Sequence, residues 1–218
     1  MRAVVVLVLL ASASVPFRWS ASLSQSRSAS LSGAGSASLS GEREYKVRLD
    51  TTKGAIVIAV HRDWAPHGAD RFNELVTSGY FDDSRFFRVV KGQWAQFGIN
   101  RDPKIATAWR ERTIPDDPRK QSNTRGRVAF AFALPNGRTT QIYISLRDNS
   151  YQDEQGFVPF GEVVEGMEVA DSLNSEYGET SGGGIRAGKQ QPVFDGGNAY
   201  LDRAYPRLDR LLRARVMP

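Results

Sequence analysis

Short runs that alternate between apolar and polar residues recur along residues 44–218, and such runs indicate strands with one buried face. A hairpin opens the pattern: residues 45–49 alternate, Lys53-Gly54 favours a turn, and residues 55–60 form the returning strand. Further strands are predicted at residues 85–90, 128–134, 141–145, 157–164 and 211–217.

One segment has clear helical spacing. Phe72, Leu75 and Val76 fall at i, i+3 and i+4, which places them on one apolar stripe. Pro66 suits the first turn of this helix, and Gly79 ends it.

The remaining segments complete the predicted architecture. Residues 166–173 predict a second helix and residues 198–205 a short one, whereas residues 100–125 are polar, contain three prolines and predict a long loop. Because short strands predominate and no βαβ alternation occurs, the pattern predicts a mainly β fold. It would be a closed antiparallel barrel with helices packed on it.

The first residues predict a secretory signal peptide over residues 1–21. Arg2 precedes an apolar run at residues 3–10 that is too short to span a bilayer, and small residues then offer candidate cleavage sites. An N-terminal core strand and a retained membrane anchor are the alternatives.

A repeat of low complexity follows the predicted signal. Ser-Ala-Ser-Leu-Ser occurs at residues 20–24, 28–32 and 36–40. Short units rich in Ser, Ala and Gly cannot bury a core, so we expect a flexible linker over residues 22–43, with a functional repeat as the alternative. Residues 44–218 form the predicted folded domain.

Composition narrows the class of protein. The chain has 218 residues, no cysteine and a net charge of +5. The absence of cysteine excludes a disulfide framework and a thiolate zinc site. The arginines are spread among acids, including those at residues 203–215, which favours a solvated face over a nucleic-acid surface. With the signal, this predicts an exported protein in the periplasm or outside the cell.

The most informative stretch is FFRVVKGQWAQFG at residues 86–98, together with Gln141, which lies 45 residues after Gln96. It joins one arginine and two glutamines to aromatic neighbours on strand-like segments, and it contains no nucleophile and no metal ligand. Such a site can bind and polarise a peptide, but it has little means of cutting one.

This stretch resembles the signature of the cyclophilin-type peptidyl-prolyl isomerases, in particular bacterial-like exported members. Residues 72–82, 134–144 and 156–169 resemble the family in the same order, so the resemblance covers about residues 45–178. It implies an eight-stranded closed barrel capped by two α-helices, and an enzyme that isomerises X-Pro bonds and assists the folding of exported proteins.

The resemblance also implies roles for single residues. Arg88 matches the catalytic arginine, and Gln96 and Gln141 match glutamines of the substrate site. Phe132 occupies the position whose main chain pairs with an extended peptide. Tyr143 matches an aromatic wall of the proline pocket.

Three aromatic residues complete the predicted substrate-binding set: Trp94, Phe86 and Phe157, each with core or rim packing as the alternative. Gln93 departs from the family, because a phenylalanine usually stands there. We expect the polar amide of Gln93 to weaken the proline pocket unless Trp94 already fills it.

The main alternative function is a non-catalytic module or chaperone that binds proline-containing segments, and Gln93 favours it, whereas Arg88 favours the enzyme. The sequence is less consistent with a hydrolase, because His61 and His67 are its only histidines and it contains no hydrolase motif. We expect both histidines at the surface. We also expect a monomer that binds proline-containing polypeptides, with no metal, no cofactor, no nucleic acid and no stable membrane insertion.

Overall fold

A computed structural model describes residues 44–178 and 189–218. The predicted signal peptide and linker lie outside the described residues. Within the two described ranges, no helix is both long enough and apolar enough to cross a membrane.

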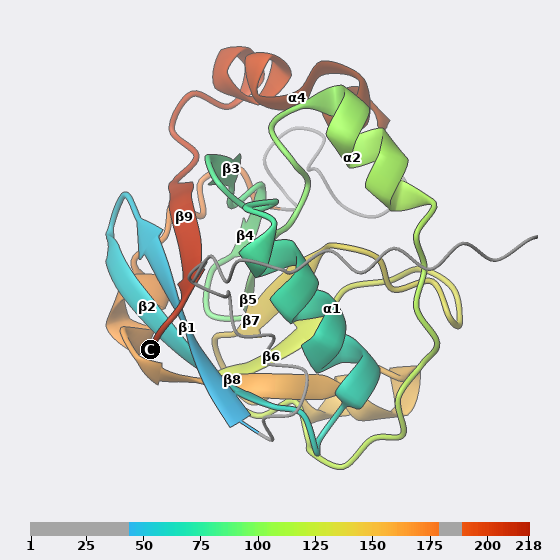
Figure 1. Cartoon of the computed structure of the whole chain (residues 1–218). Coiled ribbons are helices and arrows are strands. Elements are labelled where there is room, and N and C mark those ends of the chain that lie inside the picture. Colours follow the sequence, from blue (N-terminus) through green and yellow to red (C-terminus); the bar gives the residue numbers. More distant parts are fainter. Residues whose placement is uncertain (1–43, 179–188) are drawn as a thin grey trace, which may run out of the picture. The chain divides into compact units, whose positions relative to one another are not determined.

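The described chain is built on one antiparallel sheet of nine strands (Figure 1), in the order β3-β9-β1-β2-β8-β6-β7-β5-β4. The hairpin predicted at the start is confirmed, because β1 pairs with β2 from Glu44↔His61 to Thr51↔Gly54. The strands are β1 (Glu44–Thr51), β2 (Gly54–His61), β3 (Ser84–Arg85), β4 (Arg88–Val90), β5 (Trp94–Phe97), β6 (Arg127–Phe130), β7 (Ile142–Ser145), β8 (Pro159–Glu165) and β9 (Arg210–Val216).

A mainly β fold is confirmed, but the strand predicted over residues 85–90 is broken. β3 and β4 stand at the two ends of the strand order, separated in sequence only by Phe86 and Phe87. In the described residues the sheet therefore has nine strands instead of the eight expected, with β3 and β4 as its edges. At the break Phe86 packs in the main core, and Phe87 packs in a second cluster.

The first helix agrees closely with the sequence pattern. α1 (Pro66–Thr77) begins at Pro66 and buries Phe72, Leu75 and Val76. At its end the backbone N–H of Gly79 donates to Val76 and that of Tyr80 donates to Leu75, a Schellman motif that needs the positive φ of Gly79.

The helix predicted at residues 166–173 is confirmed, because α3 lies within this range, but the remaining helices differ from the prediction. The predicted loop over residues 100–125 contains α2, which Asp102 caps through the backbone N–H of Lys104 and which starts at Pro103. The predicted short helix at residues 198–205 is the second half of a longer helix that bends at Gly197. The bounds are α2 (Pro103–Arg110), the 3₁₀ helix η1 (Ser150–Gln155), α3 (Met167–Asp171) and α4 (Gln191–Ala204).

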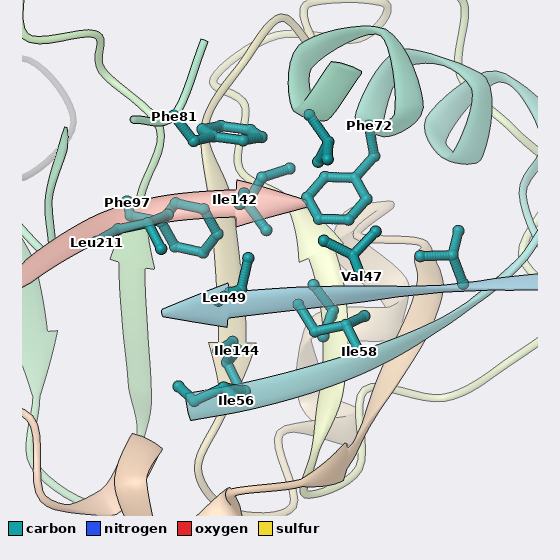
Figure 2. Packing of buried hydrophobic residues seen from close by; sticks show 14 of the residues in the cluster. Val47, Leu49, Ile56, Ile58, Phe72, Phe81, Phe97, Ile142, Ile144 and Leu211 are labelled. Carbon is teal, nitrogen blue, oxygen red and sulfur yellow. The ribbon is translucent and has the colours of Figure 1, made fainter. Parts of the chain in front are cut away.

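The main core lies between α1 and one face of the sheet. Figure 2 shows Phe72 of α1 above Val47 and Ile58 of the first hairpin, with Phe97 and Ile144 from the far strands in the same cluster. Because side chains alternate along each strand, this burial leaves the opposite face of β5, β6 and β7 free to form a site.

A second apolar cluster joins α2 to α4, which lie side by side in Figure 1. Ala106 of α2 packs with Val193 and Phe194 of α4, and Phe87 connects this cluster to the sheet edge. Because Phe87 directly precedes β4, the cluster links the start of α4 to this edge strand.

A buried ion pair ties the loop before β7 to the start of α1. Arg138 is 1% exposed, and its Nη1 donates to Asp117 Oδ2 at 2.9 Å. The carboxylate of Asp117 also accepts hydrogen bonds from the backbone N–H groups of His67 and Gly68, at 3.0 and 2.9 Å. Because carboxylates are favoured at helix N-termini, Asp117 links α1 and Arg138 through one buried group.

Candidate functional site

The pairing of β4, β5 and β7 brings the predicted site residues into one row. Arg88 is paired with Gln96, and Gln96 with Tyr143. On β5, Ala95 and Phe97 face the core, so Trp94 and Gln96 face the other side. A pocket of about 580 Å³ lies on that side.

Three polar side chains form a directed chain of hydrogen bonds in this pocket. Arg88 Nη1 donates to Gln96 Oε1 at 2.9 Å, and Gln96 Nε2 donates to Gln141 Oε1 at 2.8 Å. The order has a chemical cause, because a guanidinium can only donate and therefore fixes which end of the Gln96 amide faces it. Gln96 is 3% exposed, so its amide is held inside the protein.

Arg88 is also held from its other side. Its guanidinium carbon lies 4.9 Å from the centre of the Trp94 ring, within the range of a cation–π contact. Trp94 lines the pocket, as predicted. Arg88 is thus a half-buried, permanently charged donor whose orientation is set by an amide and an aromatic ring.

The aromatic wall consists of Phe132, Tyr143 and Phe157, all of which line the pocket. The ring centre of Phe157 lies 4.7 Å from that of Phe132 and 5.8 Å from that of Tyr143. Burial raises the pKa of Tyr143 well above its usual value, so its hydroxyl stays protonated and donates to Asn123 Oδ1 at 2.6 Å. The three rings make this wall apolar, and the hydroxyl group of Tyr143 is satisfied by its hydrogen bond to Asn123.

At this end of the pocket the prediction for Phe86 is wrong, and Gln93 follows the alternative in which Trp94 lines the wall. Phe86 does not line the pocket: it is completely buried and packs on Phe97, at a ring distance of 5.2 Å. Gln93 does not line it either, and its backbone carbonyl accepts from the amide of Leu146 and from Asn149. Trp94, and not Gln93, therefore lines this end of the pocket.

Several lining residues were not predicted. η1 brings Tyr151, Gln152 and Gln155 to the pocket, and α2 and α4 bring another group. An Asp-Pro pair before α2 was the available signal for that helix, but no local pattern indicates that α4 reaches the site. The group from α2, α4 and the residue before α4 is Arg110, Gln190, Gln191 and Phe194.

The lining residues determine what the pocket can do. They come from the described ranges and include two arginines, six aromatic residues and several amides, but no Ser, Cys, His, Asp or Glu. The histidines lie elsewhere: His67 is exposed as expected, whereas His61 is half-buried between Glu44 and Glu162. The pocket can therefore bind and polarise a peptide without covalent chemistry.

Comparison with known proteins gives a consistent picture. The family model described as cyclophilin type peptidyl-prolyl cis-trans isomerase/CLD matches residues 46–193. Peptidyl-prolyl cis-trans isomerase A of Dickeya dadantii is 30% identical over 141 residues, which is 62% of this chain and 74% of that protein. Peptidyl-prolyl cis-trans isomerase B of Escherichia coli is 30% identical over 135 residues, or 58% of this chain and 82% of that protein.

Solved structures share the fold. A cyclophilin-type peptidyl-prolyl cis-trans isomerase of Cryptosporidium parvum has a TM-score of 0.58 at 19% identity, covering 80% of this chain and 98% of that one. Its structure in the presence of the dipeptide Ala-Pro has a TM-score of 0.57 at 20% identity, covering 79% and 99%. With the Arg88–Gln96–Gln141 pocket and the family match over residues 46–193, this chain belongs to the cyclophilin-type peptidyl-prolyl cis-trans isomerase family.

Proposed function

We propose that the pocket around Arg88 is the catalytic site of a peptidyl-prolyl cis-trans isomerase that serves exported proteins. The isomerase activity follows from family membership and from relatives that carry this activity in their names. The observation that carries the assignment of the site is the hydrogen-bonded row Arg88–Gln96–Gln141 in a pocket whose described lining has no Ser, Cys, His, Asp or Glu.

The reaction needs a fixed donor and little else. Rotation about an X-Pro bond crosses a barrier of about 18–20 kcal/mol, because amide resonance must be lost. In the twisted state the imide nitrogen gains a lone pair, and a preorganised donor aimed at it stabilises that state more than the planar one. Arg88 supplies that donor, since it stays charged at all working pH values and its orientation is held by Gln96 and Trp94.

The rest of the pocket holds the peptide. Tyr143 and Phe157 offer an apolar wall for the proline ring, and Phe132 lies beside them. Gln96 and Gln141 carry amides that can bind the peptide backbone without adding charge. Holding the ring on one side and the backbone on the other lets the bond between them rotate, and no proton transfer or cofactor is required.

Isomerase activity is tested with the purified mature protein and a short Ala-Pro peptide, by measuring cis/trans exchange by NMR, which needs no coupling protease. We expect exchange to become much faster than the uncatalysed tens to hundreds of seconds. If the peptide bound and shifted pocket resonances without faster exchange, the chain would be a non-catalytic binding module instead.

The pocket wall provides a second prediction. Because Trp94 lines the pocket and Gln93 does not, we expect Trp94→Ala to lower kcat/KM by about tenfold through lost apolar contact and a freer Arg88. Gln93→Phe should give no gain. A clear gain from Gln93→Phe in the same exchange assay would show that residue 93, and not Trp94, faces the proline.

Export is the part of the proposal that rests on sequence alone. Arg2, the apolar run at residues 3–10 and the small residues after it support cleavage between about residues 13 and 21 and a location in the periplasm or outside the cell. We expect the intact mass of the mature protein to correspond to loss of these residues. Mature protein that still carries Met1 would contradict export by this signal.

The surface is consistent with a protein that acts on peptides. Ion pairs neutralise much of the basic C-terminal stretch, since Arg210, Arg213 and Arg215 bond to Asp83, Asp50 and Asp82. This supports the proposal of proline-containing polypeptides as partners over nucleic acid. We also propose that the protein is a monomer in solution.

A further inference from the structure

The hydrogen-bonded row of the active site does not end at Gln141. Gln141 Nε2 donates to Gln190 Oε1 at 2.8 Å, and Gln190 Nε2 donates back to Gln141 Oε1 at 3.0 Å. The two amides form a reciprocal pair, so four side chains from distant parts of the sequence make one continuous row from Arg88 to Gln190.

The polarity of this row follows from its charged end. Arg88 can only donate, so Gln96 must present its oxygen to it and its nitrogen to Gln141. Gln141 must then turn its oxygen toward Gln96. An isolated amide could rotate by half a turn, but Gln190 meets both ends of the Gln141 amide, so that amide can turn only if Gln190 turns with it.

The backbone at Gln190 is firmly placed. Its carbonyl accepts the first hydrogen bonds of α4, from the N–H groups of Val193 at 2.9 Å and Phe194 at 3.2 Å. Both of these side chains are buried in the cluster between α2 and α4. The ring of Phe194 also lies 4.4 Å beneath the guanidinium of Arg110. The C-terminal helix thus presents Gln190 to the pocket from a rigid support.

We propose that Gln190 is a positioning residue of the isomerase: it locks the amide of Gln141 and, through Gln96, the orientation of Arg88. This inference rests on the proposed function of the pocket and extends it to the helix α4. Each amide nitrogen of the pair keeps a second hydrogen, so Gln141 can still donate to a substrate carbonyl while Gln190 holds it.

A double-mutant cycle tests this role. We expect Gln190→Ala to lower kcat/KM on an Ala-Pro peptide by about three- to tenfold, the effect of losing two neutral hydrogen bonds, mainly through kcat. In a Gln141→Ala background the same change should have almost no effect, because Gln190 acts through Gln141. Arg203→Ala, an exposed position on the same helix, is the matched control and should leave kcat/KM unchanged.

The results of these measurements distinguish failure of the positioning role from failure of the isomerase function. Unchanged or higher activity of Gln190→Ala would overturn the proposal, since it would mean that Gln190 is neutral or obstructs the pocket. A loss that persists in the Gln141→Ala background would also overturn it. Inactivity of the wild-type protein itself would instead refute the isomerase function, so the two failures are distinguishable.

Gln190→Glu gives a second readout if the alanine variant unfolds. A carboxylate can accept from Gln141 Nε2 but cannot donate to Gln141 Oε1, whereas a protonated carboxyl group can. We therefore expect the activity of this variant, relative to wild type at the same pH, to rise as pH falls through about 4.3, the ordinary pKa of glutamate. A ratio that stays constant from pH 7 to pH 4 would contradict the positioning role.

Discussion

Replacing Arg88 by alanine is expected to lower kcat/KM by about two to three decades while the fold persists. The loss of one preorganised donor to a developing charge costs on the order of 3–4 kcal/mol of transition-state stabilisation. Arg88 is half-buried on the outer face of the sheet and contributes nothing to the main core, so its removal should leave the melting temperature nearly unchanged.

Two further variants make the test of Arg88 specific. Arg88→Lys should recover little activity, because a point charge on a flexible stem reproduces neither the planar fork toward Gln96 nor the stacking on Trp94. Arg48→Ala removes an exposed arginine on β1 and should behave like wild type. Near-wild-type exchange rates in Arg88→Ala would exclude the mechanism proposed here.

The largest expected effect on stability lies outside the pocket, at Arg138. Replacing it by methionine leaves the buried carboxylate of Asp117 without its charged partner, which costs about 3–5 kcal/mol. For a domain of this size that corresponds to a fall in melting temperature of roughly 10 °C. Thermal unfolding followed by circular dichroism measures it.

An exposed ion pair between α1 and the turn that precedes it provides the control for Arg138. Arg62 binds Asp70 at 2.6 Å, but both side chains are well exposed, so Arg62→Met should cost less than about 1 kcal/mol. Equal effects of the two substitutions would mean that the backbone of α1 alone, without Arg138, stabilises the charge of Asp117.

The ion pair between Arg138 and Asp117 also affects the site indirectly. Gly137 lines the pocket and directly precedes Arg138, and Thr140 and Gln141 follow it. Loosening this loop should therefore raise KM before it affects kcat, because Arg88 and Gln96 lie on other strands. This separates a stability variant from a catalytic one.

Local signals in the sequence predicted those elements whose ends are set by local chemistry. α1 was predicted correctly because Pro66, an apolar stripe and Gly79 all act within one helix. The first hairpin follows from alternation around a turn. By contrast, α2 was missed: its only buried residue is Ala106, so it has almost no apolar stripe of its own and gains its stability from α4.

The alternation of apolar and polar positions along the sequence could not predict where Phe86 and Phe87 pack. Continuous alternation over residues 85–90 predicts that Phe86 shares a face with Arg88, whose side chain lines the pocket. The chain instead leaves the sheet between β3 and β4, which sends Phe86 into the main core and Phe87 into the second cluster. A break of this kind depends on contacts with distant strands, which no local pattern records.

The chemistry of the site was present in the sequence from the start. An arginine, two glutamines and the family resemblance around them identified Arg88, Gln96 and Gln141, and β5 alternation then fixes the common face of Trp94 and Gln96. Only the tertiary structure decided that Trp94 lines the wall while Gln93 does not, and that Gln190 completes the row. The physical reason is that amide orientation and helix docking depend on partners brought together by folding, from positions that share no periodicity along the chain.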